Sequence, residues 1–139
     1  MKSKGQVSLE LILVMSVFFS VLLLFIPLIS KTFFLGSYVL DVSRAKSFSD
    51  SLEISVRELN SMSKDSKITL TANPLLEWKI KSEEQQTTIT VLLKKYAKEK
   101  PFTSNTFNLI PFSELEITKK TVFVLTKTDK GVLAEIQKA

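Results

Sequence analysis

Histidine and cysteine are both absent from the 139 residues of this chain. Without histidine, the chain lacks the side chain that most often performs acid–base catalysis near neutral pH. Without cysteine, it has no thiol nucleophile, no disulfide and no lipoprotein anchor, and the two absences together remove the usual zinc ligands. We therefore expect no metal site, no cofactor and no catalytic residue.

Glycine is scarce as well, with three in the whole chain. Three dispersed glycines leave no glycine-rich loop that cradles a phosphate, so we expect no nucleotide site. The carboxylates of the C-terminal half are scattered among predicted strand ends and turns, as at Glu83, Glu84, Glu114 and Glu116. These observations disfavour an enzyme.

The most distinctive feature that is present is a long uncharged run near the N-terminus. Residues 11–30 contain no charged side chain, and roughly 20 helical residues cross the hydrocarbon core of a bilayer. A cleaved secretory signal has a shorter apolar core and a small-residue cleavage site, which this chain lacks. A buried core helix is a further alternative, but large apolar residues occur on every side of the run. The run predicts a single transmembrane helix.

Charges beside the run predict its orientation. Lys2 and Lys4 precede it, and lysines in a short N-terminal segment favour a cytoplasmic location for that segment. Beyond the run, basic and acidic residues balance: Lys31, Arg44, Lys46 and Arg57 against Asp41, Asp50, Glu53 and Glu58. We expect a cytoplasmic N-terminus, with the rest of the chain outside.

The helical pattern continues past the run. Apolar residues recur at spacings of three and four, which is typical of an amphipathic helix: Tyr38, Val39, Val42, Ala45, Phe48, Leu52, Val56, Leu59 and Met62. Between Gln6 and Ser63 only Pro27 and Gly36 interrupt the pattern. Because proline withholds an amide proton, we expect a bend or a loosened turn near residues 23–27. Glu53 and Arg57 form an i,i+4 pair in the favourable order.

From Lys64 onward the apolar residues alternate with polar ones, as in β-strands. Ile68–Ala72 and Leu76–Ile80 flank an Asn73-Pro74 turn and predict a hairpin. Further strands are predicted at 87–93, 114–118, 121–126 and 132–138, with a glycine turn in TDKG, giving about five to six mostly antiparallel strands. The segment 91–101 favours a helix as readily as a strand end, and residues 101–113 are predicted to form a loop with apolar anchors: Phe102, Phe107, Leu109 and Ile110.

A head of about 75 residues is marginal by itself, because a chain of this size buries only part of its surface. The apolar stripe of the helix offers the missing cover. We therefore predict an α+β fold, with a long N-terminal α-helix whose first half is transmembrane. Its amphipathic second half packs on a small, mostly antiparallel β-sheet head.

The stretch KGQVSLE, directly before the uncharged run, resembles the class III signal peptide of archaeal type IV pilins. The matching positions are Lys4, Gly5, Gln6, Ser8 and Glu10. The resemblance covers the seven residues of KGQVSLE and the span behind them, and it does not extend to the head. Archaellins, a sister family, usually carry a glycine-rich segment that this chain lacks. Ser3 and Gln6 also have capping-box spacing, so the alternative is an ordinary helix start.

The resemblance implies that a prepilin peptidase cuts between Gly5 and Gln6. The chain then divides into a leader (1–5), a transmembrane and filament-core helix (6–35), its amphipathic extension (36–63) and the head (64–139). In a filament, Glu10 would lose its water, and a buried unpaired charge costs several kcal/mol. By resemblance, Glu10 pairs with the new α-amino group of Gln6 on a neighbouring subunit. Cyclisation of Gln6 to pyroglutamate would remove that charge and leave a hydroxyl such as that of Ser8 as donor.

The resemblance also implies partners: copies of the chain or other pilins in a helical filament, a prepilin peptidase, an assembly ATPase with its membrane platform, and lipid before assembly. It implies a cell-surface filament, of the kind that serves adhesion, on an archaeal cell. The competing hypothesis is a non-polymerising single-pass membrane protein whose small extracellular β domain binds a partner. The net charge of +5 is compatible with binding DNA or anionic polymers, but a solvated lysine rim explains it as well, so nucleic acid is not an expected partner.

Overall fold

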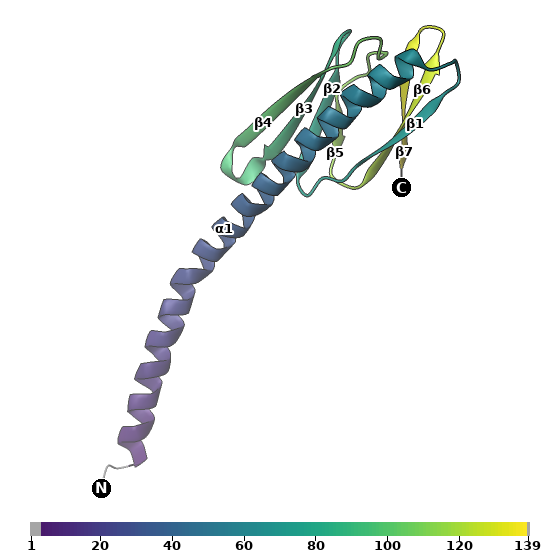
Figure 1. The fold of residues 1–139 in the computed structure, drawn as a ribbon. Coiled ribbons are helices and arrows are strands. Elements are labelled where there is room, and N and C mark those ends of the chain that lie inside the picture. The colour runs from purple at the N-terminus through teal and green to yellow at the C-terminus, as the bar shows by residue number, and fades with distance from the viewer. Residues whose placement is uncertain (1–3, 139) are drawn as a thin grey trace. The chain divides into compact units, whose positions relative to one another are not determined.

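The computed structural model describes residues 4–138, which form one α-helix, one short 3₁₀ helix and seven β-strands (Figure 1). The chain divides into two compact units, residues 1–36 and residues 37–139. Helix α1 (Lys4–Ser61) runs through the boundary between the units. The predicted α+β class is confirmed, with one long N-terminal helix packed on antiparallel sheets.

Within the second unit, α1 buries most of the stripe that its spacing predicted. Five residues are less than 8% exposed: Ala45, Phe48, Leu52, Val56 and Leu59. Tyr38 and Val42 are half-buried against the same core. The prediction is wrong at the edges of the stripe, because Val39 is 65% exposed and Met62 lies beyond the end of the helix.

The strands form two sheets in which every pairing is antiparallel. The three-stranded sheet has the order β1-β6-β7, and the four-stranded sheet has the order β4-β3-β2-β5. Figure 1 shows both sheets beside the second half of α1. Their bounds are β1 (Lys67–Ala72), β2 (Glu77–Ser82), β3 (Gln86–Leu93), β4 (Lys98–Asn105), β5 (Leu115–Ile117), β6 (Thr121–Thr128) and β7 (Gly131–Lys138).

The predicted glycine turn joins β6 to β7. Gly131 has a φ of 139°, a conformation that L side chains rarely adopt, and a Cβ there would lie 2.4 Å from the carbonyl oxygen of Asn108. Any side chain at this position would therefore displace the backbone of the 106–114 connection.

The predicted hairpin of β1 and β2 is wrong. β1 pairs with β6, whereas β2 pairs with β3 and β5. The Asn73-Pro74 connection therefore carries the chain from one sheet to the other. The physical reason is that both strands direct apolar residues toward α1. Because one helix can cover the inner faces of two small sheets, the two strands need not pair with each other.

The number of strands also exceeds the prediction, because β4 occupies part of the predicted loop at 101–113. β4 contains Pro101, which lacks the N–H that a central strand needs but is tolerated on an edge strand. In its sequence KEKPFTSN only Ser104 is buried and Phe102 half-buried, so no alternating apolar pattern marks it. The ambiguous segment before it contains a 3₁₀ turn at Lys94–Tyr96.

Two apolar clusters connect α1 with the sheets. In the first, the ring of Phe48 lies 6.0 Å from that of Trp78 and 5.5 Å from that of Phe123, so one helix residue contacts both sheets. In the second, α1, β6 and β7 meet around the 106–114 connection through Leu52, Val56, Leu59, Leu109, Leu125 and Val132. The second half of α1 is therefore the shared wall of both sheets.

Asp41 lies inside this apolar wall with no solvent exposure. Its Oδ1 accepts the backbone N–H of Leu75, and its Oδ2 accepts the backbone N–H of Leu76 and the indole N–H of Trp78, each at 2.9 Å. Hydrogen bonds to a charged acceptor are stronger than neutral ones, and a buried carboxylate requires them. Asp41 thus fastens α1 to the connection between the two sheets.

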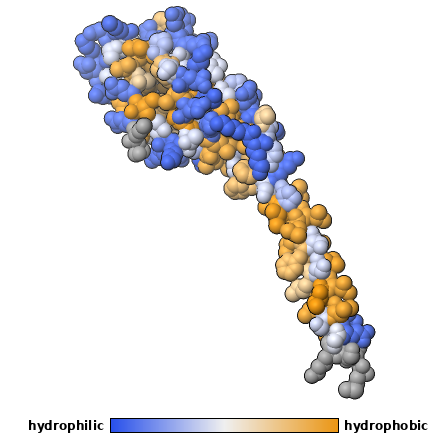
Figure 2. Space-filling model, turned by 180° about the vertical axis from the view of Figure 1, so that it is seen from behind, coloured by the Kyte–Doolittle hydropathy of each residue, from blue (hydrophilic) through white to orange (hydrophobic). Residues whose placement is uncertain are grey.

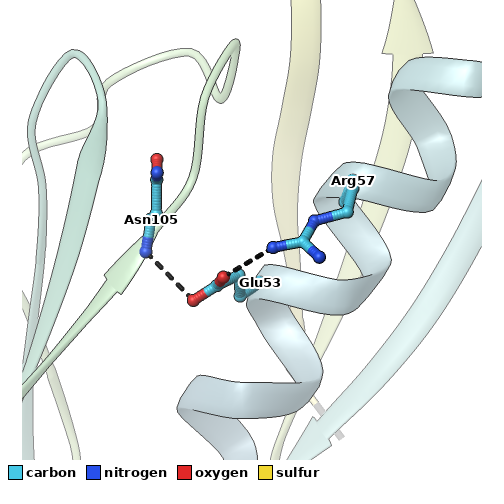
Figure 3. A network of polar contacts seen from close by, with 3 residues as sticks. All are labelled: Glu53, Arg57 and Asn105. Carbon is cyan, nitrogen blue, oxygen red and sulfur yellow. Dashed lines mark hydrogen bonds and ion pairs between the residues drawn. The ribbon is translucent and has the colours of Figure 1, made fainter.

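Further along the helix, Glu53 lies between Arg57 and the end of β4 (Figure 3). Its Oε1 accepts a hydrogen bond from Arg57 Nη2 at 2.9 Å, which confirms the predicted i,i+4 pair. Its Oε2 accepts the backbone N–H of Asn105 at 3.2 Å. The side chain of Asn60 continues this seam, donating to the carbonyl oxygen of Phe107 and accepting from Lys127 Nζ.

Replacing the buried carboxylate, Asp41→Ala, is expected to lower the free energy of unfolding by about 3 kcal/mol, because it leaves one buried and two part-buried N–H groups without their acceptor. Trp78 is the only tryptophan of the chain, so its fluorescence follows urea unfolding of the detergent-solubilised protein. The matched control is Asp50→Asn, at an exposed position of the same helix. Equal midpoints for Asp41→Ala and the parent chain would contradict the role of Asp41.

Candidate functional site

The residues of the predicted signal motif lie in the first turns of α1. Lys4 is the first helical residue, and Gly5, Gln6, Ser8 and Glu10 are all exposed. A Cβ added at Gly5 would meet no atom within 4 Å, so the fold gives no reason for glycine at this position. The leader residues before Lys4, including the alternative cap Ser3, lie outside the described residues.

The helix brings two of the predicted assembly residues onto one face. Gln6 and Glu10 are four residues apart, and residues at this spacing are neighbours on a helix surface. Ser8 lies midway between them in sequence and therefore on another side. A partner that contacts Glu10 would also lie beside Gln6.

Among the described residues of the first unit, every position from Gly5 to Ile29 is exposed. The large apolar side chains between Val7 and Ile29 are 43% to 76% exposed. Figure 2 shows hydrophobic residues along this part of the helix on the face that it displays, whereas hydrophilic residues predominate on the head. A continuous apolar surface of this kind requires lipid or protein to cover it.

Among residues 4–138, α1 is the one helix that is long and apolar enough to cross a membrane. Hydroxyl groups within it are satisfied locally: Ser20 donates to the carbonyl oxygen of Ser16 at 2.8 Å, and Thr32 donates to that of Leu28 at 3.0 Å. In lipid, an unpaired hydroxyl would be costly. The helix also continues through Pro27 without a break. These features suit a segment that enters a bilayer.

Of the acidic residues Glu83, Glu84, Glu114 and Glu116, three form exposed ion pairs with lysines of β2. Lys79 Nζ lies 3.0 Å from Glu116 and 3.3 Å from Glu114, and Lys81 Nζ lies 2.8 Å from Glu83. Hydrogen bonds from the lysines lower the pKa of Glu116 and of Glu83 and raise the pKa of both lysines. These shifts move every group away from neutrality, whereas a general acid needs a raised carboxyl pKa.

The same pKa shifts define the pH range in which these ion pairs favour folding. A carboxylate with a lowered pKa stabilises the fold at pH values above its pKa in the unfolded chain, and this stability is lost as the pH falls. A lysine with a raised pKa stabilises the fold at pH values below its pKa in the unfolded chain, and this stability is lost as the pH rises. The pairs therefore favour folding at pH values between the ordinary pKa values of glutamate and lysine, and those of Lys79 join β2 to the β5 region. Because they are exposed, their contribution is small. Within the described part of the chain, no three acidic residues gather in a way that could hold a metal ion.

No protein-family model, no curated protein and no solved structure matches this chain. The fold and the exposed helix define its class on physical grounds: a chain with one membrane-length apolar helix that continues into a small β head.

Membrane insertion is expected to fail when three arginines are placed on the uncharged run, in Val17→Arg/Val21→Arg/Leu24→Arg. Each arginine near the centre of a span costs about 2.5–3.5 kcal/mol, so three exceed the gain from the apolar residues. Membrane fractionation with carbonate washing measures the outcome. The matched control places three arginines on exposed positions of the second half of the helix, Ser43, Ser47 and Ile54, and should remain in the membrane. A triple variant that stays embedded would contradict a transmembrane role for the run.

Proposed function

We propose that this chain is the structural subunit of a surface filament of the type IV pilus kind. It is made as a membrane-anchored precursor, cleaved between Gly5 and Gln6, and polymerised through the first half of α1. The observation that carries the proposal is the position of the KGQVSLE motif, directly at the start of an apolar helix that is exposed on all sides. A signal motif and an uncovered helix are both needed for such a subunit.

The orientation of the precursor follows from its N-terminal charges. Lys2 and Lys4 hold the leader in the cytoplasm, and the head stands outside. Cleavage then removes both lysines and leaves Gln6 as the first residue. The peptidase is a partner only for this step, and the helix remains in lipid afterwards.

Packing of many helices replaces lipid around each span by protein. Lipid tails are as apolar as leucine, so the gain comes from close packing and polar contacts rather than from hydrophobic transfer. We infer that extraction from the membrane needs an ATPase and a membrane platform supplied by other proteins.

Glu10 provides the polar contact in this scheme. Inside a bundle of apolar helices its carboxylate would be buried, and the α-amino group of Gln6 on a neighbouring copy would offset that cost. After cleavage, the α-amino group of Gln6 lies about one helical turn before Glu10, so each copy presents a donor and an acceptor at the N-terminal end of its helix. This arrangement fixes the axial register between neighbours.

Cleavage is tested by mass spectrometry of the full chain recovered from membranes that contain a prepilin peptidase. The product is expected to begin at Gln6, and the same spectrum shows whether Gln6 has cyclised. Gly5→Val should block processing, because the bulky side chain prevents close approach of the peptidase to the backbone. Gly36→Ala is the matched control, since a Cβ there also meets no atom within 4 Å. Recovery of the parent chain with Met1 intact would favour the non-polymerising membrane anchor instead.

Assembly is tested by electron microscopy of fibres from cells with intact pilus machinery. Glu10→Ala should be processed normally but yield at least about tenfold fewer fibres, because losing a buried charged contact costs more than 1.4 kcal/mol. Glu58→Ala, at an exposed carboxylate of the same helix, is the control and should assemble. Normal fibres from Glu10→Ala would refute the role of Glu10, and a parent chain that is processed but forms no fibres would refute the filament itself.

A further inference from the structure

Three connections of the head meet at one end of the two sheets. Ala72, the last residue of β1, pairs with Thr121, the first residue of β6. Leu93, the last residue of β3, pairs with Lys98, the first residue of β4. The connections that leave these strand ends, 73–76, 94–97 and 118–120, therefore lie together. We call this set of connections the entry end.

The entry end is the end at which α1 enters the second unit. Asp41 lies in the second turn of the helix after the unit begins at Ser37. Its carboxylate accepts the backbone N–H groups of Leu75 and Leu76, which belong to the first connection. The strand β5 contributes the third connection beside it, because Ile117 pairs with Trp78 near the start of β2.

The charged side chains of the entry end are all basic. Its three connections contain four lysines and no carboxylate: Lys94, Lys95, Lys119 and Lys120. All four are exposed, and β4 then begins with exposed residues of both signs, Lys98 and Glu99. Lys94 Nζ is paired with Glu77 at 2.6 Å, and Lys95 is engaged by contacts of its own as well.

The opposite end of the sheets differs. Its connections 62–66, 83–85 and 129–130 contain two lysines and four carboxylates: Lys64, Lys130, Asp65, Glu83, Glu84 and Asp129. Two of these carboxylates are already engaged by lysines, Asp129 by Lys64 and Glu83 by Lys81. The head is therefore electrically polarised, with its basic end beside the helix entry.

Apolar and aromatic side chains accompany the lysines at the entry end. Leu75 is 47% exposed at the tip of the first connection, and Val39 and Leu40 are 65% and 59% exposed on the adjoining turn of α1. Tyr96 lies half-buried in the second connection, with Lys95 Nζ 5.8 Å from its ring centroid. Lysines interspersed with leucine and tyrosine are typical of surfaces that sit at a membrane–water interface.

We propose that the entry end is a docking surface for anionic phospholipid headgroups of the bilayer that α1 spans. Only residues 31–36 separate the uncharged run from the second unit, so the tether between span and head is short. A second copy of the chain is a weaker occupant, because two of the four carboxylates at the opposite end are already engaged by lysines. The inference rests on the membrane-anchored precursor of the proposed function and adds a lipid partner that holds the head before assembly.

The test uses the absence of cysteine, which allows a single label on the full chain. Leu75→Cys carries an environment-sensitive fluorophore at the entry end, and Lys130→Cys carries the same fluorophore at the opposite end. Each chain is reconstituted in vesicles of phosphatidylcholine, alone or mixed with phosphatidylglycerol, that contain a headgroup-attached quencher. The entry-end label should be quenched about twofold or more in the anionic vesicles relative to the neutral ones, and raised salt should abolish the difference. The opposite-end label should not distinguish the two lipids.

Two matched variants assign the effect to the entry end. Lys119→Gln/Lys120→Gln should reduce the quenching ratio toward about one, because each lysine near the surface contributes to the attraction. Lys64→Gln/Lys67→Gln removes the same charge from exposed positions at the opposite end and should leave the ratio unchanged. Equal effects of both variants would overturn the proposal, since they would indicate attraction by net charge alone.

The remaining outcomes separate this inference from the proposed function. A chain that inserts but whose entry-end label is insensitive to lipid charge overturns the docking surface alone. Quenching that appears only at high protein density indicates a second copy as occupant and also overturns it. A chain that inserts in neither vesicle overturns both, whereas failure of cleavage or of fibre formation leaves the vesicle result standing.

Discussion

The head depends on the stripe that α1 buries. Sheets of three and four strands are too small to form a core by themselves, and Phe48 contacts aromatic rings from both. Asp41 then fixes where the stripe lies. Its three hydrogen bonds join the helix to the connection that leads from β1 in one sheet to β2 in the other, and to Trp78 at the start of β2. Removing the second half of the helix would therefore expose the inner faces of both sheets.

Local sequence patterns predicted the elements whose residues face a single environment. The uncharged run and the amphipathic stripe gave the helix, which ends at Ser61, two residues from the predicted Ser63. Strands β1, β2 and β3 showed clear alternation of apolar and polar residues, and their positions in the sequence were predicted to within two residues. β4 was missed because its solvent-facing edge tolerates Pro101 and two lysines, so its sequence shows no alternating pattern that would indicate the pairing with β3.

Long-range relations were harder to predict. β1 pairs with β6 about 50 residues later, and nothing in either strand specifies that partner over the adjacent β2. The role of Asp41 did leave a signal, since it lies three residues after Tyr38 and four before Ala45, in phase with the buried stripe. The entry end left none, because its lysines come from connections more than 20 residues apart that only the strand register brings together. The motif at residues 4–10, in contrast, is contiguous and could be recognised directly.

The two halves of α1 present the same chemical problem in different settings. Asp41 is a carboxylate in an apolar wall, and the fold resolves its burial with three N–H donors of the same chain. Glu10 is exposed in the single chain, and in the proposed filament it would become a carboxylate surrounded by apolar helices. A hydrogen bond requires a donor within about 3 Å, so in a bundle only a narrow range of axial offsets would place the amine of Gln6 within reach. In every other register the buried carboxylate would have no donor, so those registers would be disfavoured. Asp41 disfavours other positions of the β1–β2 connection for the same reason.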